Sequence, residues 1–346
     1  MVELTEVHYY HAFARACHGE YRELEAAFRS AGSWVAAWEQ GPGKGNKRDP
    51  AEAWGELGRS GITIILADDA AFPVLLREIP FPPFGLYVRG ALPSEGPAVA
   101  VVGTRKASHF GLRAARMFAE RFGVRGIPVV SGLAFGVDAA AHEGSLAARG
   151  ATVAVLANGL DAVYPRSHAG LAERIVASGG ALVSEYPPGS PALPRRFLER
   201  NRIVSGLARG VVVIEAPQAS GALATARFAL EQNREVFVIP GPASHPNYAG
   251  SHALVKAGAA LVTEPQDVFD ALGLGDVDAA ASDAPSLTAV GSASALLTVL
   301  RREGRPLDAD TLAARAERSA SETQAELTDL IMRGLVEERG GKYLAR

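Results

Sequence analysis

The sequence is poor in cysteine, and this scarcity excludes two kinds of site. Cys17 is the single cysteine among 346 residues, so the chain can form neither an intramolecular disulfide nor a cysteine-based zinc site. No apolar run approaches the ~20 residues that span a bilayer. The opening MVELTEVHYY lacks a basic segment and an apolar core, so we expect no signal peptide. These absences predict a soluble, cytoplasmic protein that does not contact a membrane.

The charge balance is mildly acidic overall and basic in one segment. The formal net charge is -3, and 48% of residues are hydrophobic, which is typical of a well-packed globular protein. Residues 195–209 contain five arginines and one acid, Glu199, so their sum is +5 − 1 = +4. A focused basic patch attracts phosphates, although the same spacing also fits a solvated helix face.

The middle of the chain alternates short apolar runs with helix-length segments. The runs are rich in Val, Ile and Ala, and they occupy residues 98–102, 127–131, 151–157, 181–185, 210–216, 235–241 and 260–264. Apolar runs without alternation indicate strands buried on both faces of a largely parallel sheet. We therefore predict an α/β domain over residues 91–273, with a doubly wound, mostly parallel sheet. Its ligand should lie at the carboxyl ends of the strands.

The flanking segments have other patterns. Residues 1–90 repeat apolar side chains at helical spacing, which predicts a small helical domain, and the proline-rich residues 79–97 predict an extended linker. Residues 274–290 are rich in Ala, Ser, Gly and Asp and predict a flexible linker. Residues 291–346 predict three short helices and a glycine-turned hairpin, the order found in a winged helix.

Glycine-containing turns follow several of the predicted strands. Glycine lets backbone N–H groups approach an anion, and hydroxyls or arginine forks complete a phosphate cradle. A further basic run stands just before a helix-like stretch that precedes residues 210–216. We therefore predict a site for a phosphate-bearing ligand, either a nucleotide or a nucleic-acid strand. The candidate residues are Gly103, Thr104, Arg105, Ser131, Gly132, Arg200, Asn201, Arg202, Ser220, Gly221 and Gly241.

Three of the residues near these turns have alternative roles. Arg105 could bind ligand phosphate or pair with the carboxylate of Asp138 or Glu215, and its planar fork favours phosphate. Phe197 and Tyr164 border the basic positions, where an aromatic ring could stack on an unpaired base. Core packing is the alternative for both rings, and we expect it more for Tyr164.

The familiar cofactor and catalytic motifs are incomplete. Gly103 is followed by TRKAS, so the dinucleotide fingerprint is absent from the first strand-to-helix turn. His142 begins a zinc-helix motif, but Leu146 replaces the second histidine, so we expect His142 to buttress the sheet. Asp138 and Asp161 follow glycines and are expected to brace loops. We predict no catalytic residues, no metal and no cofactor.

A series of segments through the sheet region carries a family resemblance. The segments are LLREIPFPPFGLYVRG, VVGTRKAS, SGLAFGVDAAAH, GLDAVYP, SEYPPGSP, RNRIVSGLARGVVVIEA and SGALATA, followed by a PG turn. In this order they resemble the DNA-processing protein A family (DprA, also called Smf) of bacterial transformation. The resemblance implies an extended Rossmann-like fold between a sterile-alpha-motif-like N-terminal domain and a C-terminal winged helix.

The resemblance also implies a function without catalysis. Members of the family bind single-stranded DNA, protect incoming strands during natural transformation and load the RecA recombinase onto them. It further implies a homodimer, with residues 250–254 near its interface. Gly103, Arg105, Arg166 and residues 200–202 would form the phosphate pocket, and Phe197 would contact a base. Positions that depart from the family pattern are His168, Leu198, Glu199, Ala222 and His252.

Two other functions fit parts of the chain. A nucleoside-monophosphate phosphoribohydrolase would have a similar sheet, but Ala226 and Arg227 stand where those enzymes carry a glutamate. An adaptor acting only through its terminal domains is the other alternative. The C-terminal segment fits contact with a protein or with duplex DNA equally well.

Overall fold

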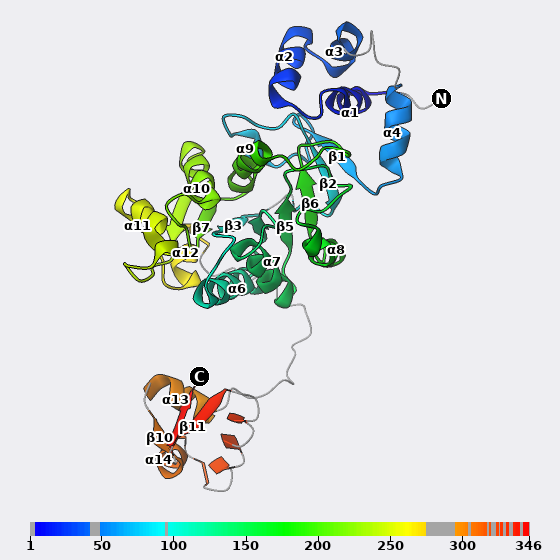
Figure 1. Cartoon of the computed structure of the whole chain (residues 1–346). Helices are drawn as coiled ribbons and strands as arrows, with labels where there is room; N and C mark the ends of the chain where they lie inside the picture. Colours follow the sequence, from blue (N-terminus) through cyan, green and yellow to red (C-terminus); the bar gives the residue numbers. More distant parts are fainter. Residues whose placement is uncertain are drawn as a thin grey trace. The chain divides into compact units, whose positions relative to one another are not determined.

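The computed structural model shows two compact units, residues 1–278 and 279–346 (Figure 1). It describes residues 4–41, 49–93 and 96–274 and, in the C-terminal part, 295–303, 306–316, 318–319, 323–324, 326–327, 330–331, 335–339 and 342–345. Most of the predicted linker at 274–290 lies outside the described residues. None of the described helices is long and apolar enough to cross a membrane.

A nine-stranded sheet forms the centre of the first unit. Strands β3 to β9 run parallel to one another, whereas β2 pairs antiparallel with β6 and β1 pairs antiparallel with β2 at the edge. Each apolar run predicted as a strand contains one, so the doubly wound, mostly parallel sheet is confirmed. The order across the sheet is β1 (Thr63–Leu66), β2 (Gly85–Gly90), β6 (Ala181–Ser184), β5 (Thr152–Val155), β4 (Val129–Ser131), β3 (Val99–Val102), β7 (Gly210–Val213), β8 (Glu235–Val238) and β9 (Ala260–Leu261).

The strand order reverses between β3 and β7, and this reversal positions the ligand site. After β3, the chain first adds β4, β5 and β6 on one side of that strand. It then adds β7, β8 and β9 on the other side. Val99 pairs with Gly210 and Val102 with Val213, so the two strands end level. The turns that follow them diverge to opposite sides and leave a crevice at the carboxyl edge, where open α/β sheets bind ligands.

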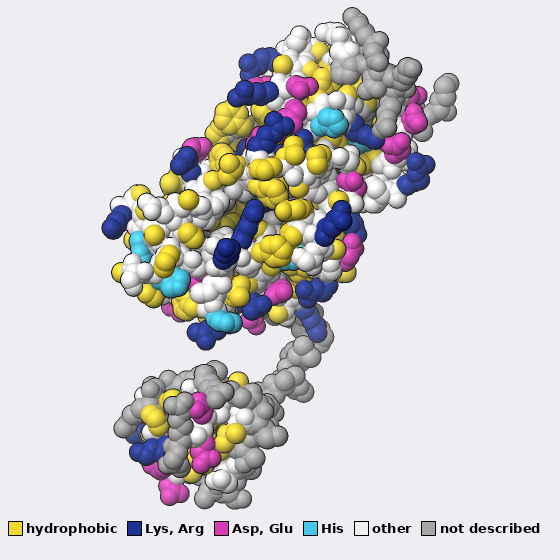
Figure 2. All heavy atoms as spheres, in the orientation of Figure 1, with side chains coloured by type: hydrophobic (Ala, Val, Ile, Leu, Met, Phe, Trp, Pro, Cys, Tyr) yellow, Lys and Arg dark blue, Asp and Glu magenta, His cyan; other side chains and the backbone are white. Residues whose placement is uncertain are grey.

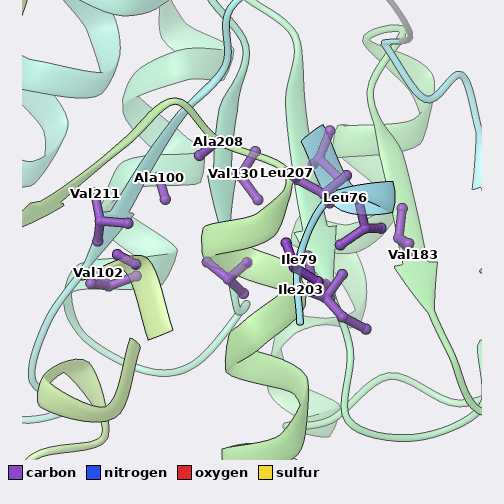
Figure 3. Packing of buried hydrophobic residues seen from close by; sticks show 14 of the residues in the cluster. Leu76, Ile79, Ala100, Val102, Val130, Val183, Ile203, Leu207, Ala208 and Val211 are labelled. Carbon is purple, nitrogen blue, oxygen red and sulfur yellow. The ribbon is translucent and has the colours of Figure 1, made fainter. Parts of the chain in front are cut away.

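Helices cover both faces of the sheet. On β3, Val99 and Val101 pack toward α6 (His109–Val124), α7 (Val137–Ala147) and α12 (Pro265–Ala271). Ala100 and Val102 belong to the opposite cluster, which includes Ile203 of α9 and Leu76 of α5 (Figure 3). The helices and short turns that complete this part are α5 (Val74–Arg77), η2 (Arg166–His168), α8 (Ala169–Ala177), α9 (Pro194–Gly206), α10 (Gly221–Glu231), η3 (Pro246–Tyr248) and α11 (Ala249–Lys256).

The packing of α6 against α7 depends on the absence of a side chain at Gly144. A Cβ built there would lie 2.8 Å from the Cα of Arg116. We expect Gly144→Ala to lower the free energy of unfolding by about 1–3 kcal/mol, because the two helices must move apart. Urea denaturation measures the change. Gly55→Ala is the control, since a Cβ there meets nothing within 4 Å, and it should stabilise helix α4 (Pro50–Gly58) by about 0.5–1 kcal/mol. Equal effects of the two substitutions would contradict close packing at Gly144.

The N-terminal helices pack on the sheet and are not a detached domain. They are α1 (Glu6–Ala16), α2 (Tyr21–Ala31), α3 (Trp34–Gln40) and α4. Tyr10 and Trp34 share one hydrophobic cluster with Tyr87 of β2 and Leu182 of β6. The Tyr10 hydroxyl donates to the carbonyl of Gly85 at 3.3 Å. The sequence-based interpretation of this region as separate from the sheet is therefore corrected.

The prediction of an extended linker at residues 79–97 is wrong for Gly85–Gly90, which form strand β2. Leu86, Tyr87 and Val88 are at most 2% exposed, and β2 pairs antiparallel with β6. The prolines at positions 80, 82 and 83 all precede the strand and leave its ladder hydrogen bonds intact. A proline-rich approach therefore concealed an ordinary buried strand.

The second unit has a small core of its own. Helices α13 (Ala295–Glu303) and α14 (Ala309–Arg315) accompany a three-stranded antiparallel sheet in the order β10 (Leu307–Asp308), β12 (Lys342–Ala345), β11 (Val336–Arg339). Leu296, Leu312 and Tyr343 are among its buried residues. The strands β11 and β12 lie where the hairpin is predicted. The predicted third helix falls partly outside the described residues, and the winged-helix assignment stays a prediction.

Candidate nucleic-acid interface

A cavity of about 590 Å³ opens at the carboxyl edge of β3, β4 and β7. Turns after these three strands, the turn after β5, and the helices α9 and α10 line it. Figure 2 shows basic and hydrophobic side chains intermingled near the middle of the visible face of this unit. The predicted contacts that line the cavity are Gly103, Thr104, Arg105, Gly132, Phe197, Arg200, Asn201, Ser220 and Gly221.

Four predicted contacts do not line the cavity. The Ser131 hydroxyl is fully buried and donates to the carbonyl of Val101 at 2.7 Å, so it braces the sheet. Gly241 lies against the ring of Tyr248, which a Cβ at this position would strike. Arg166 is exposed in the short turn η2, beyond Tyr164 at the rim. Arg202 lies on another side of helix α9. These four positions lie outside the cavity that brings the other predicted contacts together.

The basic run that the sequence analysis placed before a helix lies inside helix α9, which directs its arginines to different sides. Arg200 and Arg202 lie inside α9. Side chains two positions apart on an α-helix point in directions that differ by about 200° around the helix axis. Arg200 therefore points toward β4 and β5, where its Nη1 donates to the carbonyl of Gly132 at 2.9 Å and to that of Val155. Arg202 points toward Glu185, at the end of β6. Two arginines only two positions apart thus make different contacts.

Arg200 lies in the floor of the cavity and is only 4% exposed. Burial lowers its pKa to about 10, although the nearby Asp138 carboxylate acts in the opposite direction. Burial also raises the pKa of Asp138, against the charge of Arg200. The carboxylate accepts the amides of Gly132 and Ala134 at 3.1 and 3.4 Å, so it braces the turn after β4 as predicted. The Arg200 guanidinium and the Asp138 carboxylate are therefore both engaged by the turn after β4, and little free positive charge remains at the floor.

The predicted basic patch at residues 195–209 is not a continuous surface. Arg195 and Arg196 both pair with Glu20, which caps the start of α2, and Arg196 also lies 4.4 Å over the ring of Tyr186. Arg202 makes two hydrogen bonds to the Glu185 carboxylate, at 2.7 and 2.6 Å. Most of the positive charge counted in the sequence therefore anchors the N-terminal helices and the turn before β2.

Arg105, Phe197 and Tyr164 lie together at the rim of the cavity. The Arg105 guanidinium lies 5.3 Å from the centre of the Phe197 ring, and the Tyr164 ring meets Phe197 edge-on at 5.4 Å. Arg105 is exposed, as is Lys106, a lining residue that the sequence analysis did not select. Tyr164 is 49% exposed, so the expectation of core packing for it is wrong. These four side chains offer cations beside aromatic faces.

Neither carboxylate considered as a partner of Arg105 pairs with it. Glu215 is fully buried and accepts hydrogen bonds from Ser108, from Asn247 at 2.8 Å and from Tyr248 at 3.0 Å. Burial alone would raise the Glu215 pKa, but these bonds outweigh it and lower the pKa. The Asp138 carboxylate accepts hydrogen bonds from the turn after β4. The Arg105 guanidinium is therefore positioned by the Phe197 ring and available to a phosphate.

Backbone groups can complete a phosphate contact. Helix α10 begins at Gly221, and its cap Ser220 accepts the Ala222 amide at 3.2 Å. The first N–H groups of this helix lie at the cavity, where the helix dipole favours an anion. Gly136 has φ of 77° and lies against the backbone of Thr104 and Arg105, so glycine is required where the turns after β3 and β4 touch.

The described residues hold no group of three or more His, Cys, Asp or Glu side chains arranged to bind a metal ion. His142 is fully buried and bonds to Thr152 at 2.7 Å, so it buttresses β5 as predicted. On α10, Ala226 is buried in the core and Arg227 is exposed. The lining thus offers recognition chemistry for phosphate and aromatic groups.

The chain is similar to characterised bacterial proteins. A sequence model described as DNA recombination-mediator protein A matches residues 63–273. Protein Smf of Escherichia coli is 46% identical over 213 residues, which cover 61% of this chain and 57% of that protein. DNA processing protein DprA of Bacillus subtilis is 37% identical over 214 residues, covering 61% of this chain and 72% of the relative. The chain thus matches somewhat more than half the length of the Escherichia coli protein.

Two solved structures resemble this fold. The structure of DprA from Streptococcus pneumoniae has a TM-score of 0.63 and 31% identity, covering 78% of this chain and 98% of that one. DNA processing protein A from Helicobacter pylori has a TM-score of 0.55 and 26% identity, covering 62% and 96%. The latter structure concerns that protein's single-stranded DNA binding mode.

Proposed function

Because this chain belongs to the DNA recombination-mediator protein A family, we propose that its cavity binds single-stranded DNA. One observation carries the proposal. Arg105, Phe197 and Tyr164 come from three separate segments and meet at the rim of one cavity, at the switch point of the sheet. A cation for the backbone and aromatic faces for the bases are what an unpaired strand requires. A duplex hides its base faces and cannot use the rings.

We propose further that the protein acts in the cytoplasm without catalysis, as a recombination mediator. In this role it protects incoming strands during natural transformation and transfers them to the RecA recombinase. We also propose a homodimer with residues 250–254 near its interface, since two cavities on one dimer would hold a long strand with avidity. The C-terminal unit would then contact duplex DNA or a protein. Affinities for labelled oligo-dT and for duplex of equal length, each at several salt concentrations, test the DNA preference.

Arg105→Ala should weaken oligo-dT binding by about 1 kcal/mol or more and lower the salt slope by about 0.7, because one phosphate contact is lost. Fluorescence anisotropy titrations measure both quantities. Arg209→Ala is the matched control, because Arg209 is exposed and directly precedes β7, at the opposite edge of the sheet. Equal affinity and slope for the two variants would remove the cavity as the DNA site.

A further inference from the structure

A second exposed aromatic pair lies next to the cavity. Phe135 is 49% exposed and stands in the turn after β4, next to the cavity-lining Ala134. Its ring meets the His168 ring edge-on, with 4.8 Å between ring centres and 71° between their planes. His168 ends η2 and therefore follows Tyr164, which lines the cavity, by four residues. The pair bridges the turns after β4 and β5.

The structure holds this pair in one arrangement. The Nδ1 atom of His168 lies 2.8 Å from the carbonyl oxygen of Leu133. A carbonyl oxygen only accepts, so Nδ1 carries the proton and donates it. Leu133, two residues before Phe135, has φ of 57°, and Gly136, directly after it, has φ of 77°, so the backbone bends on both sides of Phe135. A ring fixed by its neighbours loses little conformational entropy when it binds a flat partner.

The pair extends the row of cation and ring side chains at the rim. Arg105, Phe197 and Tyr164 form one end, and exposed Arg166 lies in η2 between Tyr164 and His168. The four residue steps from Tyr164 to His168 span at most about 14 Å, which is a few nucleotides of extended strand. Phe135 stays 49% exposed beside the His168 ring, so part of its ring surface is accessible to a base. Arg166 thus stands in the chain between one member of each aromatic pair, and its exposed guanidinium is available to a backbone phosphate of a strand that reaches both pairs.

We propose that Phe135, held by His168, is a second base-stacking platform, and that a bound strand runs from Phe197 past Arg166 to Phe135. The inference rests on the proposed function, because it extends the same DNA site beyond the cavity. It assigns a role to Arg166, which does not line the cavity, and to His168, which departs from the family pattern. The partner it identifies is the unpaired bases of the strand.

The test measures affinities of the full chain for oligo-dT from about 4 to about 16 nucleotides, the range of single-strand sites. Phe135→Ala should leave the shortest oligomers unaffected and weaken the longer ones by roughly fivefold to a hundredfold, the range for loss of one stacked base. Phe135→Trp should retain the affinity. An abasic strand of the longest length should bind the native chain and Phe135→Ala equally, since it has no bases to stack.

Leu230→Ala is the matched control. Leu230 is 56% exposed and lies near the end of α10, about 14 Å along that helix from Gly221 at the cavity. If Phe135→Ala equals Leu230→Ala at every length while Phe197→Ala weakens binding, the second platform is wrong and the cavity site stands. If Phe197→Ala and Arg105→Ala also have no effect, the proposed function itself fails. A Phe135→Ala loss that persists on the abasic strand likewise overturns the stacking role.

Discussion

Replacing Arg202 by alanine should lower the free energy of unfolding by about 3–5 kcal/mol, the usual effect of removing one partner of a buried ion pair. Arg202 is 7% exposed and its partner Glu185 is 6% exposed. Burial works against the charge of Arg202, but the carboxylate outweighs it and the pKa of Arg202 is raised. Without the guanidinium, Glu185 keeps an uncompensated charge in the interior, and the carbonyl of Phe81 loses its donor at 3.0 Å. Urea denaturation followed by circular dichroism measures the loss.

Two further variants separate the ion pair from general damage at the Arg202 site. Arg29→Ala removes an exposed partner of Glu25 on α2, and it should change stability by less than about 0.5 kcal/mol. The double variant Arg202→Met with Glu185→Leu should regain most of the loss, because neither charge remains. A loss for Arg202→Ala no larger than that for Arg29→Ala would contradict the buried pair. Under conditions where Arg202→Ala is fully folded, its affinity for oligo-dT should match that of the native protein, since Arg202 does not line the cavity.

Lowering the pH from 7 to 5 should destabilise the protein by about 4 kcal/mol through two buried histidines. Burial lowers the pKa of His142 to about 3 and that of His11 to about 4, with Arg200 and Arg15 among the charges that add to the effect. Both pKa values in the folded protein lie below the unfolded value near 6.5. The stabilisation that comes from burying these histidines in neutral form is therefore complete above pH 6.5, and it is lost as the pH falls toward the folded pKa values. At pH 5 each histidine accounts for about 2 kcal/mol, from 1.5 pH units at 1.36 kcal/mol per unit.

The measurement is the difference between urea unfolding free energies at pH 7 and pH 5. His142→Gln should reduce that difference by about 2 kcal/mol, whatever its effect at pH 7, because the titrating group is gone. His109→Gln should leave it unchanged, since His109 is exposed at the start of α6. Burial raises the pKa of Asp138, so its protonation acts in the opposite sense, and the comparison between variants cancels it. An undiminished pH difference in His142→Gln would refute the assignment.

The sheet could be predicted because its information is local. A strand buried on both faces needs a continuous apolar run, and runs such as 98–102 and 210–216 stand out between amphipathic segments. The turn residues were visible for the same reason, since glycine after a strand opens the backbone wherever the strand lies. Gly103, Arg105 and Gly132 could therefore be placed at one edge of the sheet before any contact was known, and they line one cavity.

The ion-pair partners of the arginines could not be predicted, because those partners lie far away in the sequence. Arg196 meets Glu20, 176 residues before it, and Arg202 meets Glu185 only because α9 turns that side away from the cavity. The prolines before β2 concealed that strand. The N-terminal helices were predicted, but their packing on the sheet was not, because no local pattern shows that they contact Tyr87.

The sequence by itself determined the doubly wound sheet, the edge where a ligand can bind and the resemblance to a DNA-processing family. Only the tertiary structure decided which charges face solvent. A strand is specified by the apolar run within it, whereas the role of a charge depends on which opposite charges the whole fold brings within a few ångströms of it.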